Sequence, residues 1–357
     1  MFVYLTIFIL EIITIPIYIY KKSIYLIINV IPLWIVMAYR SWNVGIDTPN
    51  YKVFFYQGGM YNVGPAFINW FFPFHTRFEN GFVLLNHIVY SISPNFQLMI
   101  IVTSTITMSC FIFFLTQLKI NYVVGMLTYE TVTFMASCMN LMRQGIALSM
   151  CMVAFVYVIK RKPIKFILIT YLAATMHVTA WLFLPIYLLK KVKLNTKSII
   201  GVIIVTVILS TSFEFFYSKI AVVSDEAQSF AQEIANNGFN GLSNIIFSVV
   251  IIAFILYISQ RVNTDTNNTL LNSSSLMLLV TLIVFIVAIK FSQLSRIAMY
   301  FMIGLFPILS FLVGGYDLKK DKVLNIVITI SALIAYFILI QTLRPQWSGI
   351  VPYSFSF

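Results

Sequence analysis

Guanidinium groups occur at two places beside amide or phenol side chains, at spacings that place them together on one face of a helix. Asn140, Arg143 and Gln144 lie three and four residues apart, and helical residues at those separations are neighbours. Arg296 and Tyr300 repeat the four-residue spacing, with the phenol one turn further along. A guanidinium is a planar donor that binds phosphate oxygens in pairs. The pattern therefore indicates sites for an anion and its neighbouring hydroxyls; a long side chain that only reaches back to solvent is the alternative for Arg143.

Two further residues have side chains that can transfer a proton. Glu79 and Asn86 are seven residues apart, so they share a face if a helix begins near Glu79. His177 lies in the middle of residues 166–189, which contain no Lys, Arg, Asp or Glu. An imidazole titrates near neutral pH and suits a general base, and a carboxylate can act as a base or bind sugar hydroxyls. The alternatives are a solvated helix face for Glu79 and a hydrogen-bonded structural role for His177.

Residues 40–81 form the longest polar stretch and contain Arg40, Asp47 and Arg77. The sequence Asp47-Thr-Pro predicts a helix start, because aspartate caps helix N-termini and proline is accepted in the first turn. Asp47 then acts as a cap, or it holds Arg40 or a sugar hydroxyl.

The composition places this chemistry in a membrane. Of the 357 residues, 60% are hydrophobic and 10% are charged, against roughly 45–50% and 25% in soluble domains. A folded core of this length cannot bury so much apolar surface, so a soluble enzyme and a disordered chain are both excluded. The net charge of +12 comes from basic clusters that lie between apolar runs. This placement is typical of membrane topology and argues against nucleic acid as a partner.

We expect an all-α integral membrane protein, a polytopic bundle of about 10–12 transmembrane helices that forms one domain over residues 1–357. Residues 81–93 are short for a span, and residues 166–189 are interrupted by Pro185 and by polar residues around His177. We expect 166–189 to be a re-entrant or broken segment, since backbone of that kind is tolerated where it lines a protein cavity. Glu130 lies midway along another segment, and we expect it to pair inside the protein. The segments expected to span are 2–20, 23–39, 95–118, 122–138, 143–159, 198–216, 244–259, 274–290, 297–313 and 323–341.

The basic residues predict the orientation, because Lys and Arg are enriched on the cytoplasmic side. With ten spans both termini face outward, most lysines lie inside, and five of the seven arginines lie outside. The outer face then carries the loops 40–81 and 217–243. Lysines orient a membrane protein as point charges, whereas arginines at the outer leaflet suit a phosphate-bearing ligand. Chance placement of a few arginines is the alternative.

The sequence contains no motif that is known to bind a metal or a nucleotide. There is no phosphate-binding Gly-rich loop, no Walker lysine motif and no HExxH. The three cysteines lie in apolar segments without metal-ligand spacing, and the acids of the loop 217–243 are explained by a solvated helix. We therefore expect no cofactor, no bound metal and no use of nucleotide hydrolysis.

Taken in order, four motifs over roughly residues 38–190 resemble the EpsG family of Wzy-type polysaccharide polymerases. The chain departs from the family pattern at Glu79-Asn-Gly, where Glu-Pro-Gly or similar is expected. The motifs are Arg40…Val44-Gly-Ile-Asp47-Thr48-Pro-Asn50-Tyr51, Glu79-Asn-Gly81-Phe…Leu85-Asn86, Asn140…Arg143-Gln144…Ala147 and His177-Val-Thr-Ala180…Leu184-Pro185.

The resemblance implies a glycosyltransferase of the bacterial inner membrane with its active site facing the periplasm or exterior. Such an enzyme transfers a growing glycan from undecaprenyl pyrophosphate onto a lipid-linked repeat unit, in the synthesis of O-antigen, lipopolysaccharide, capsule or exopolysaccharide. Donor and acceptor are both lipid-linked oligosaccharides, and a chain-length regulator protein is a candidate partner.

On this interpretation Arg143 and Arg296 contact the pyrophosphate, followed by Arg40 and Arg77, because preorganised guanidiniums stabilise charge that develops on a leaving group without a metal. His177 is the first candidate for the base and Glu79 the second. The residues that orient sugars or arginines are Asp47, Asn86, Asn140, Gln144 and Tyr300.

Two other functions fit part of the pattern. An O-antigen ligase would use the same donor and a similar cationic site. A flippase for lipid-linked oligosaccharide would need charges along both leaflets, and the intramembrane charges here are few.

Overall fold

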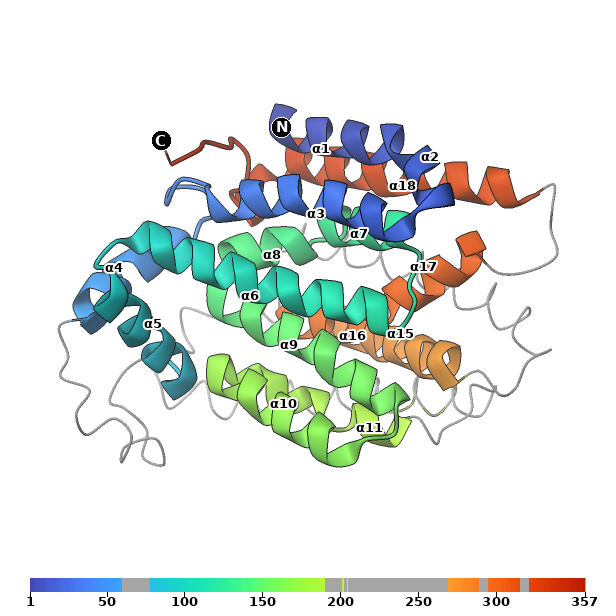
Figure 1. Cartoon of the computed structure of the whole chain (residues 1–357). Helices are drawn as coiled ribbons and strands as arrows, with labels where there is room; N and C mark the ends of the chain where they lie inside the picture. Colours follow the sequence, from blue (N-terminus) through green and yellow to red (C-terminus); the bar gives the residue numbers. More distant parts are fainter. Residues whose placement is uncertain are drawn as a thin grey trace. The chain divides into compact units, whose positions relative to one another are not determined.

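The computed structural model describes residues 1–59, 78–189, 269–288, 295–314 and 321–356, together with Gly201 and Ile204. Within these ranges every regular element is a helix, so the predicted all-α class is confirmed (Figure 1). The chain forms two compact units, one made of Met1–Trp181 with Leu309–Phe357 and the other of Leu182–Ile308. Apart from Gly201 and Ile204, the expected spans 198–216 and 244–259 and the loop 217–243 lie outside the described residues.

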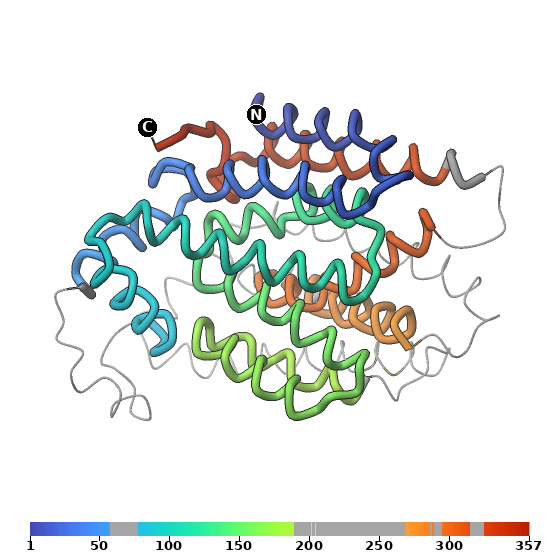
Figure 2. The backbone as a smooth tube through the Cα atoms, in the orientation of Figure 1, coloured from blue at the N-terminus to red at the C-terminus, as the bar shows by residue number. Residues whose placement is uncertain are grey.

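The first unit contains most of the described helices, and the backbone tube in Figure 2 follows them in chain order. They are α1 (Phe2–Ile13), α2 (Ile15–Tyr20), α3 (Lys22–Ala38), α4 (Thr48–Gly59), α5 (Asn80–Ile92), α6 (Phe96–Gln117), α7 (Tyr122–Thr131), α8 (Phe134–Asn140), α9 (Met142–Ile159), α10 (Pro163–Met176), the start of the 3₁₀ helix η2 (Val178–Phe183), the end of α17 (Leu305–Gly314), α18 (Asp321–Leu343) and the 3₁₀ helix η4 (Pro345–Trp347).

The second unit contains α11 (Ile186–Leu189), α15 (Thr269–Ala288) and α16 (Ser295–Met302). Helices α15 and α16 pack on each other. Gly304 follows α16, and a Cβ added there would lie 2.5 Å from the carbonyl oxygen of Ser274, so a larger residue would separate these segments.

Three of the helices, α6, α9 and α18, are long and apolar enough to cross a membrane, and the bent pair α16–α17 adds a fourth if it counts as one span. The protein is therefore a multi-pass membrane protein by helix length and hydropathy. The described part of the chain thus has fewer full-length spans than the ten to twelve expected. The reason is that several expected spans are broken into shorter apolar helices.

The breaks have local causes in the sequence. The segment 2–20 divides at Thr14, because Pro16 has no backbone N–H and is accepted only in a first helical turn. The segment 122–138 divides where Thr133 adopts a left-handed conformation with φ 67°. The segment 166–189 is broken as predicted, since α10 ends at Met176 and His177 is extended with φ −155° and ψ 121°. Neither Thr133 nor His177 has a proline or glycine directly beside it.

Two helix starts follow the sequence closely. The backbone carbonyl of Asp47 accepts the N–H groups of Asn50 and Tyr51 at 3.1 and 3.2 Å, so α4 begins where Asp47-Thr-Pro predicted. Helix α5 begins directly after Glu79, in agreement with the short helix expected over 81–93.

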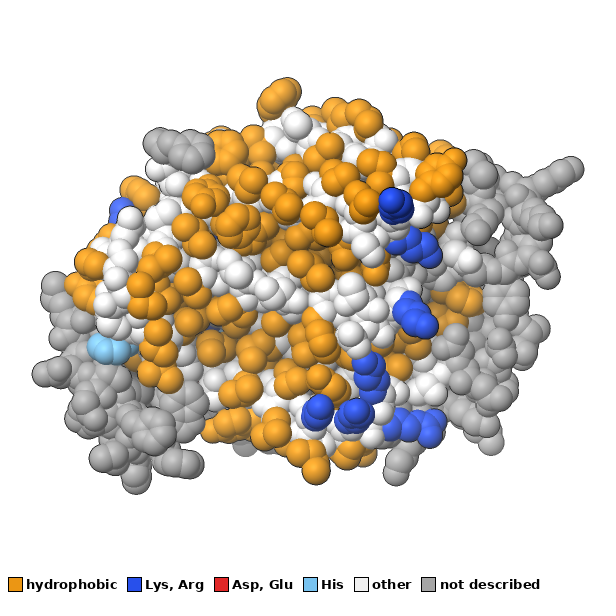
Figure 3. Space-filling view, in the orientation of Figure 1, with side chains coloured by type: hydrophobic (Ala, Val, Ile, Leu, Met, Phe, Trp, Pro, Cys, Tyr) orange, Lys and Arg blue, Asp and Glu red, His pale blue; other side chains and the backbone are white. Residues whose placement is uncertain are grey.

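Helices α3, α6, α9 and α10 lie side by side in the first unit (Figure 1). At one end the Gln97 amide of α6 donates to the Ala38 carbonyl at the end of α3, 2.7 Å away. At the other end Lys160, after α9, bonds Gln117 at the end of α6. The first end therefore carries the start of α9 and the end of α10, and the second carries Lys22 and the loops around Lys119 and Lys160. Figure 3 shows the Lys and Arg side chains of this view gathered mainly at that second end.

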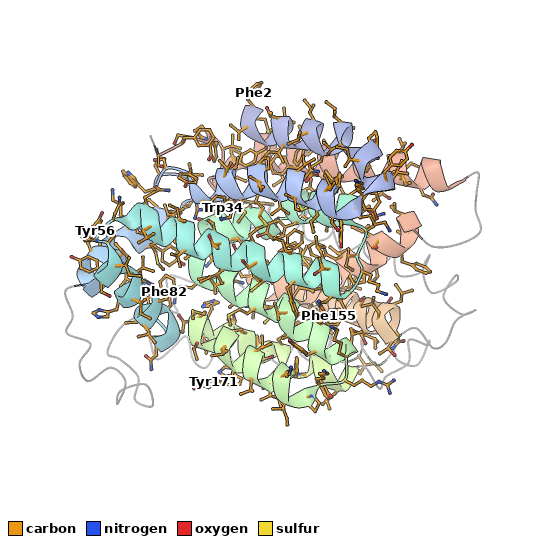
Figure 4. All side chains as sticks on the ribbon, viewed as in Figure 1. Phe2, Trp34, Tyr56, Phe82, Phe155 and Tyr171 are labelled. Carbon is orange, nitrogen blue, oxygen red and sulfur yellow. The ribbon has the colours of Figure 1, made fainter. Side chains whose placement is uncertain are left out.

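Burial divides the side chains of these helices. Phe82 of α5 and Phe155 of α9 are both 0% exposed and lie among the helices, whereas Phe2 is 82% exposed and points away from them (Figure 4). Phe82 belongs to a buried cluster with Tyr51, Phe55 and other apolar residues of α4, α5, α6 and α9.

The segment after α18 returns to the loop that follows α3. The N–H of Gly45 donates to the Gly349 carbonyl at 2.9 Å, and the N–H of Ser41 donates to the Ser354 carbonyl at 2.8 Å. The Tyr4 hydroxyl of α1 donates to the Ile350 carbonyl at 3.0 Å. The tail thereby fixes both α1 and the loop.

Candidate functional site

Glu79 is the centre of a three-residue charged cluster in the first unit. Its Oε2 lies 2.5 Å from Nη1 of Arg143, and its Oε1 lies 2.9 Å from Nδ1 of His177. The backbone N–H of Val178 also donates to Oε1, at 3.1 Å. Three candidates that lie far apart in the sequence therefore meet, and all three side chains remain partly exposed, at 18%, 18% and 20%.

The cluster depends on a break and on a close helix contact. Helix α10 stops at Met176 and His177 is extended, so the backbone N–H of Val178 is not used by the helix and donates to Glu79. Helix α5 reaches this break because Gly81 has no side chain. A Cβ at Gly81 would lie 2.3 Å from Oγ1 of Thr175 and 2.8 Å from its carbonyl oxygen. Only glycine allows α5 to approach α10 closely enough for Glu79 to bond His177.

Arg143 lies in the first turn of α9 and is held from two sides. Its Cζ is 4.4 Å from the centre of the Phe78 ring, a cation–π contact, while Glu79 accepts from Nη1. Its Nε is buried and makes no hydrogen bond among the described residues. A guanidinium has five N–H donors and this side chain remains 18% exposed, so it can still offer donors to a ligand.

The partners of Glu79 keep its carboxylate charged. Burial on its own would raise the pKa of Glu79, but the hydrogen bonds from His177 and Val178 and the charge of Arg143 outweigh it and lower the pKa to about 2. An ionised carboxylate can only accept, so the Nδ1 of a neutral His177 carries the ring proton and its Nε2 is left as an acceptor. This arrangement makes His177 a better candidate base than Glu79.

Arg40 lies elsewhere, inside the protein. Its side chain is 0% exposed, and it donates to the carbonyls of Met37 and Met139 and to the Ser104 hydroxyl. Burial lowers the pKa of Arg40 to about 10, so it stays charged at neutral pH. Its guanidinium joins the end of α3 to the end of α8 and makes no contact with the Glu79 cluster in the described part of the chain.

The expected polar stripe of Asn140, Arg143 and Gln144 does not lie on one helix. Asn140 is the last residue of α8, and the non-helical Leu141, with φ −98° and ψ 66°, separates it from α9. Asn140 instead accepts the backbone N–H of Asp47 at 2.8 Å and so holds the loop before α4. Gln144 is 3% exposed on α9.

The remaining candidates are distributed over several elements. Asn86 is buried on α5, where its amide donates to the Phe82 carbonyl at 2.7 Å. Arg296 and Tyr300 share α16 of the second unit, Arg296 exposed and Tyr300 buried, and their role with the Glu79 cluster stays a prediction. Arg77 lies outside the described residues.

Sequence reasoning missed two features of the site. The Phe78 ring packs against the Arg143 guanidinium. Its position next to Glu79 was the only sequence feature that pointed to it. The contact of Gly81 with Thr175 had no signal except the glycine itself. No group of three or more metal-ligating side chains occurs in the described ranges.

These features define a multi-pass helical membrane protein with a charged, partly exposed cluster at the end of its first unit opposite the lysines. The chain matches the EpsG family over residues 23–355 and belongs to it. This family of membrane proteins is linked to exopolysaccharide biosynthesis. The match extends well beyond the four motifs, and no curated protein or solved structure is significantly similar to the chain.

Proposed function

We propose that this protein is a glycan polymerase. It transfers a growing glycan from undecaprenyl pyrophosphate to a lipid-linked repeat unit at the outer leaflet of the bacterial inner membrane. The observation that carries the proposal is the meeting of Glu79, Arg143 and His177 at one end of the first unit.

Arg143 contacts the pyrophosphate. Glu79 and Phe78 hold its guanidinium in place, so the donors that remain need little reorganisation when charge develops on the leaving group. Arg296 and Arg77 are candidates for a second contact. Arg40, buried with its donors on backbone carbonyls, supports the loop that contains Asp47.

His177 is the general base. Its Nε2 takes the proton of the acceptor hydroxyl as the hydroxyl oxygen bonds the anomeric carbon of the donor. The bond from that carbon to the phosphate oxygen breaks, and the pyrophosphate leaves with the electron pair. Glu79 holds the ring through Nδ1 and stabilises the imidazolium that forms.

The orientation follows from the charges. Lys22, Lys119 and Lys160 lie at the end of the first unit opposite the cluster. Because lysines favour the cytoplasmic side, this distribution supports an exterior position for the Glu79 cluster, on the side where we propose that the lipid-linked substrates bind.

The test is polymerisation in cells that lack the native gene and carry variants of it. Arg143→Lys keeps the charge but loses the planar fork. We expect it to cut polymer synthesis strongly, with Arg143→Ala and His177→Ala abolishing it, while surface glycan with single repeat units accumulates. The matched control is Arg344→Lys, an arginine near the Trp347 ring at the start of the C-terminal tail.

The outcomes separate the alternatives. Wild-type chain lengths in both Arg143 variants would remove the leaving-group role. Loss of all glycan, single units included, would indicate a ligase. Retention of labelled repeat units on the inner leaflet would indicate a flippase.

A further inference from the structure

Two glutamates that are far apart in the sequence meet where α1, α3 and α7 pack together. Glu11 of α1 is 0% exposed and Glu130 of α7 is 1% exposed. Their carboxyl groups lie within interaction range of each other. The internal partner expected for Glu130 is thus a second acid, not a base.

This junction contains an unusual number of unpaired polar atoms. Both carboxyl oxygens of Glu11, Oε1 of Glu130 and the hydroxyl of Tyr25 are buried and, apart from the contact between the two carboxyl groups, have no hydrogen-bond partner among the described residues. Tyr25 is 0% exposed and lies close enough to interact electrostatically with both carboxyl groups. Buried polar groups are almost always hydrogen-bonded. Several buried polar atoms without a donor or acceptor partner therefore point to a bound proton or ion between them.

No cationic side chain among the described residues fills this role. The Nζ of Lys22, at the start of α3, lies 5.4 Å from the centre of the Tyr18 ring, and the described residues contain no ion pair to either glutamate. Phenols are neutral at physiological pH. The other tyrosines on the helices packed here are Tyr4 of α1, Tyr18 and Tyr20 of α2, Tyr122 and Tyr129 of α7 and Tyr336 of α18.

Two facing carboxylates in an apolar interior cannot both stay ionised without a positive charge between them. We propose that Glu11, Glu130 and Tyr25 form a binding site for a single monovalent cation, a proton or a sodium ion, held between the two carboxyl groups. The site is independent of the Glu79 cluster and of the proposed polymerase activity. It fastens α1 to α7 as long as the cation is present.

Thermal unfolding of the purified full chain in detergent tests the site. In sodium-free choline buffer, we expect the apparent Tm of the wild type to fall by at least ~2 °C between about pH 6 and about pH 10, relative to Glu11→Gln/Glu130→Gln. The sign follows because the folded pair holds its proton more tightly than the unfolded chain, so stability is lost as the proton leaves. Asp47→Asn, which removes a carboxylate from the loop before α4, is the control.

Sodium chloride at about pH 10 separates the two cations. Recovery of the wild-type Tm by sodium, but not by choline chloride, assigns sodium as a ligand; no recovery assigns the proton alone. If the difference between wild type and the double variant changes with neither pH nor sodium, the proposal is overturned.

Infrared spectroscopy of the wild type provides a readout that needs no variant. In sodium-free buffer at about pH 7 the site must hold a proton, so a protonated-carboxyl C=O band that shifts in D₂O is expected. Absence of that band overturns the proposal even if the glutamine variants fail to fold.

Discussion

Replacing Gly81 by alanine should separate Glu79 from His177 without touching any charged group. A Cβ at this position would lie 2.3 Å from Oγ1, 2.7 Å from Cβ and 2.8 Å from the carbonyl oxygen of Thr175. Rotation of the Thr175 side chain relieves only the first contact, because the other two atoms are fixed by the backbone. After that rotation the closest remaining contact is 2.7 Å, so the start of α5 must still move by about 0.7 Å from α10 to reach an ordinary contact of 3.4 Å.

Such a shift breaks the 2.9 Å bond between Glu79 and His177. Overpacking of this kind costs about 1–3 kcal/mol of stability, and misplacement of a catalytic group by 1 Å lowers a rate by roughly 100-fold. We therefore expect Gly81→Ala to lose most polymerisation while the protein still inserts and folds. The assay measures polymer length and rate in membranes, with the apparent Tm of the purified protein recorded in parallel.

A matched control and a partial rescue test whether the contact between Gly81 and Thr175 is the cause. Gly314→Ala also adds a methyl group to a helix, and no atom of the described residues lies within 4 Å of that position, so its activity should be unchanged. Gly81→Ala combined with Thr175→Gly removes two of the three clashes and should recover part of the activity. Wild-type rate and Tm in Gly81→Ala alone would refute the close-contact explanation.

Three further outcomes are expected. Because the folded-state pKa of Glu79 is about 2, below its ordinary 4.5, the wild type should lose apparent Tm as pH falls through that window, and Glu79→Gln should lose less in the same melts. Arg40→Ala removes the guanidinium donor from the Met37 carbonyl and leaves the Met139 carbonyl only the Thr48 hydroxyl, so it should destabilise by roughly 2–4 kcal/mol, seen as a lower Tm and lower yield from membranes. Asn140→Ala should cost about 1 kcal/mol and raise the KM for the acceptor more than it lowers kcat, measured with purified lipid-linked repeat unit.

Local signals in the sequence predicted much of the fold. The start of α4 at Asp47-Thr-Pro depends on the chemistry of a few adjacent residues, as does the break of 166–189 at His177. The division of 122–138 could not be foreseen, because Thr133 takes a left-handed conformation that a β-branched residue rarely adopts and that only tertiary packing can impose.

The candidate site was predicted in its members but not in its geometry. Arg143 and Glu79 could be selected from their helical spacing to neighbouring amides, and His177 because it is an ionisable side chain in a charge-free stretch. Their contact depends on α5 approaching α10 at Gly81, which is a non-local property. Arg40 shows the converse, because its sequence setting resembles that of the others while the structure buries it.

The tail that returns to the loop after α3 has a consequence for biosynthesis. The N–H of Gly45 is satisfied by Gly349, and the hydroxyl of Tyr4 by Ile350. These partners are about three hundred residues apart, so ribosomes complete the first helices long before the residues that secure them are made. Until then, the emerging chain must hold an unfinished loop at the membrane surface, and an insertase or chaperone that acts late in translation would find its substrate there.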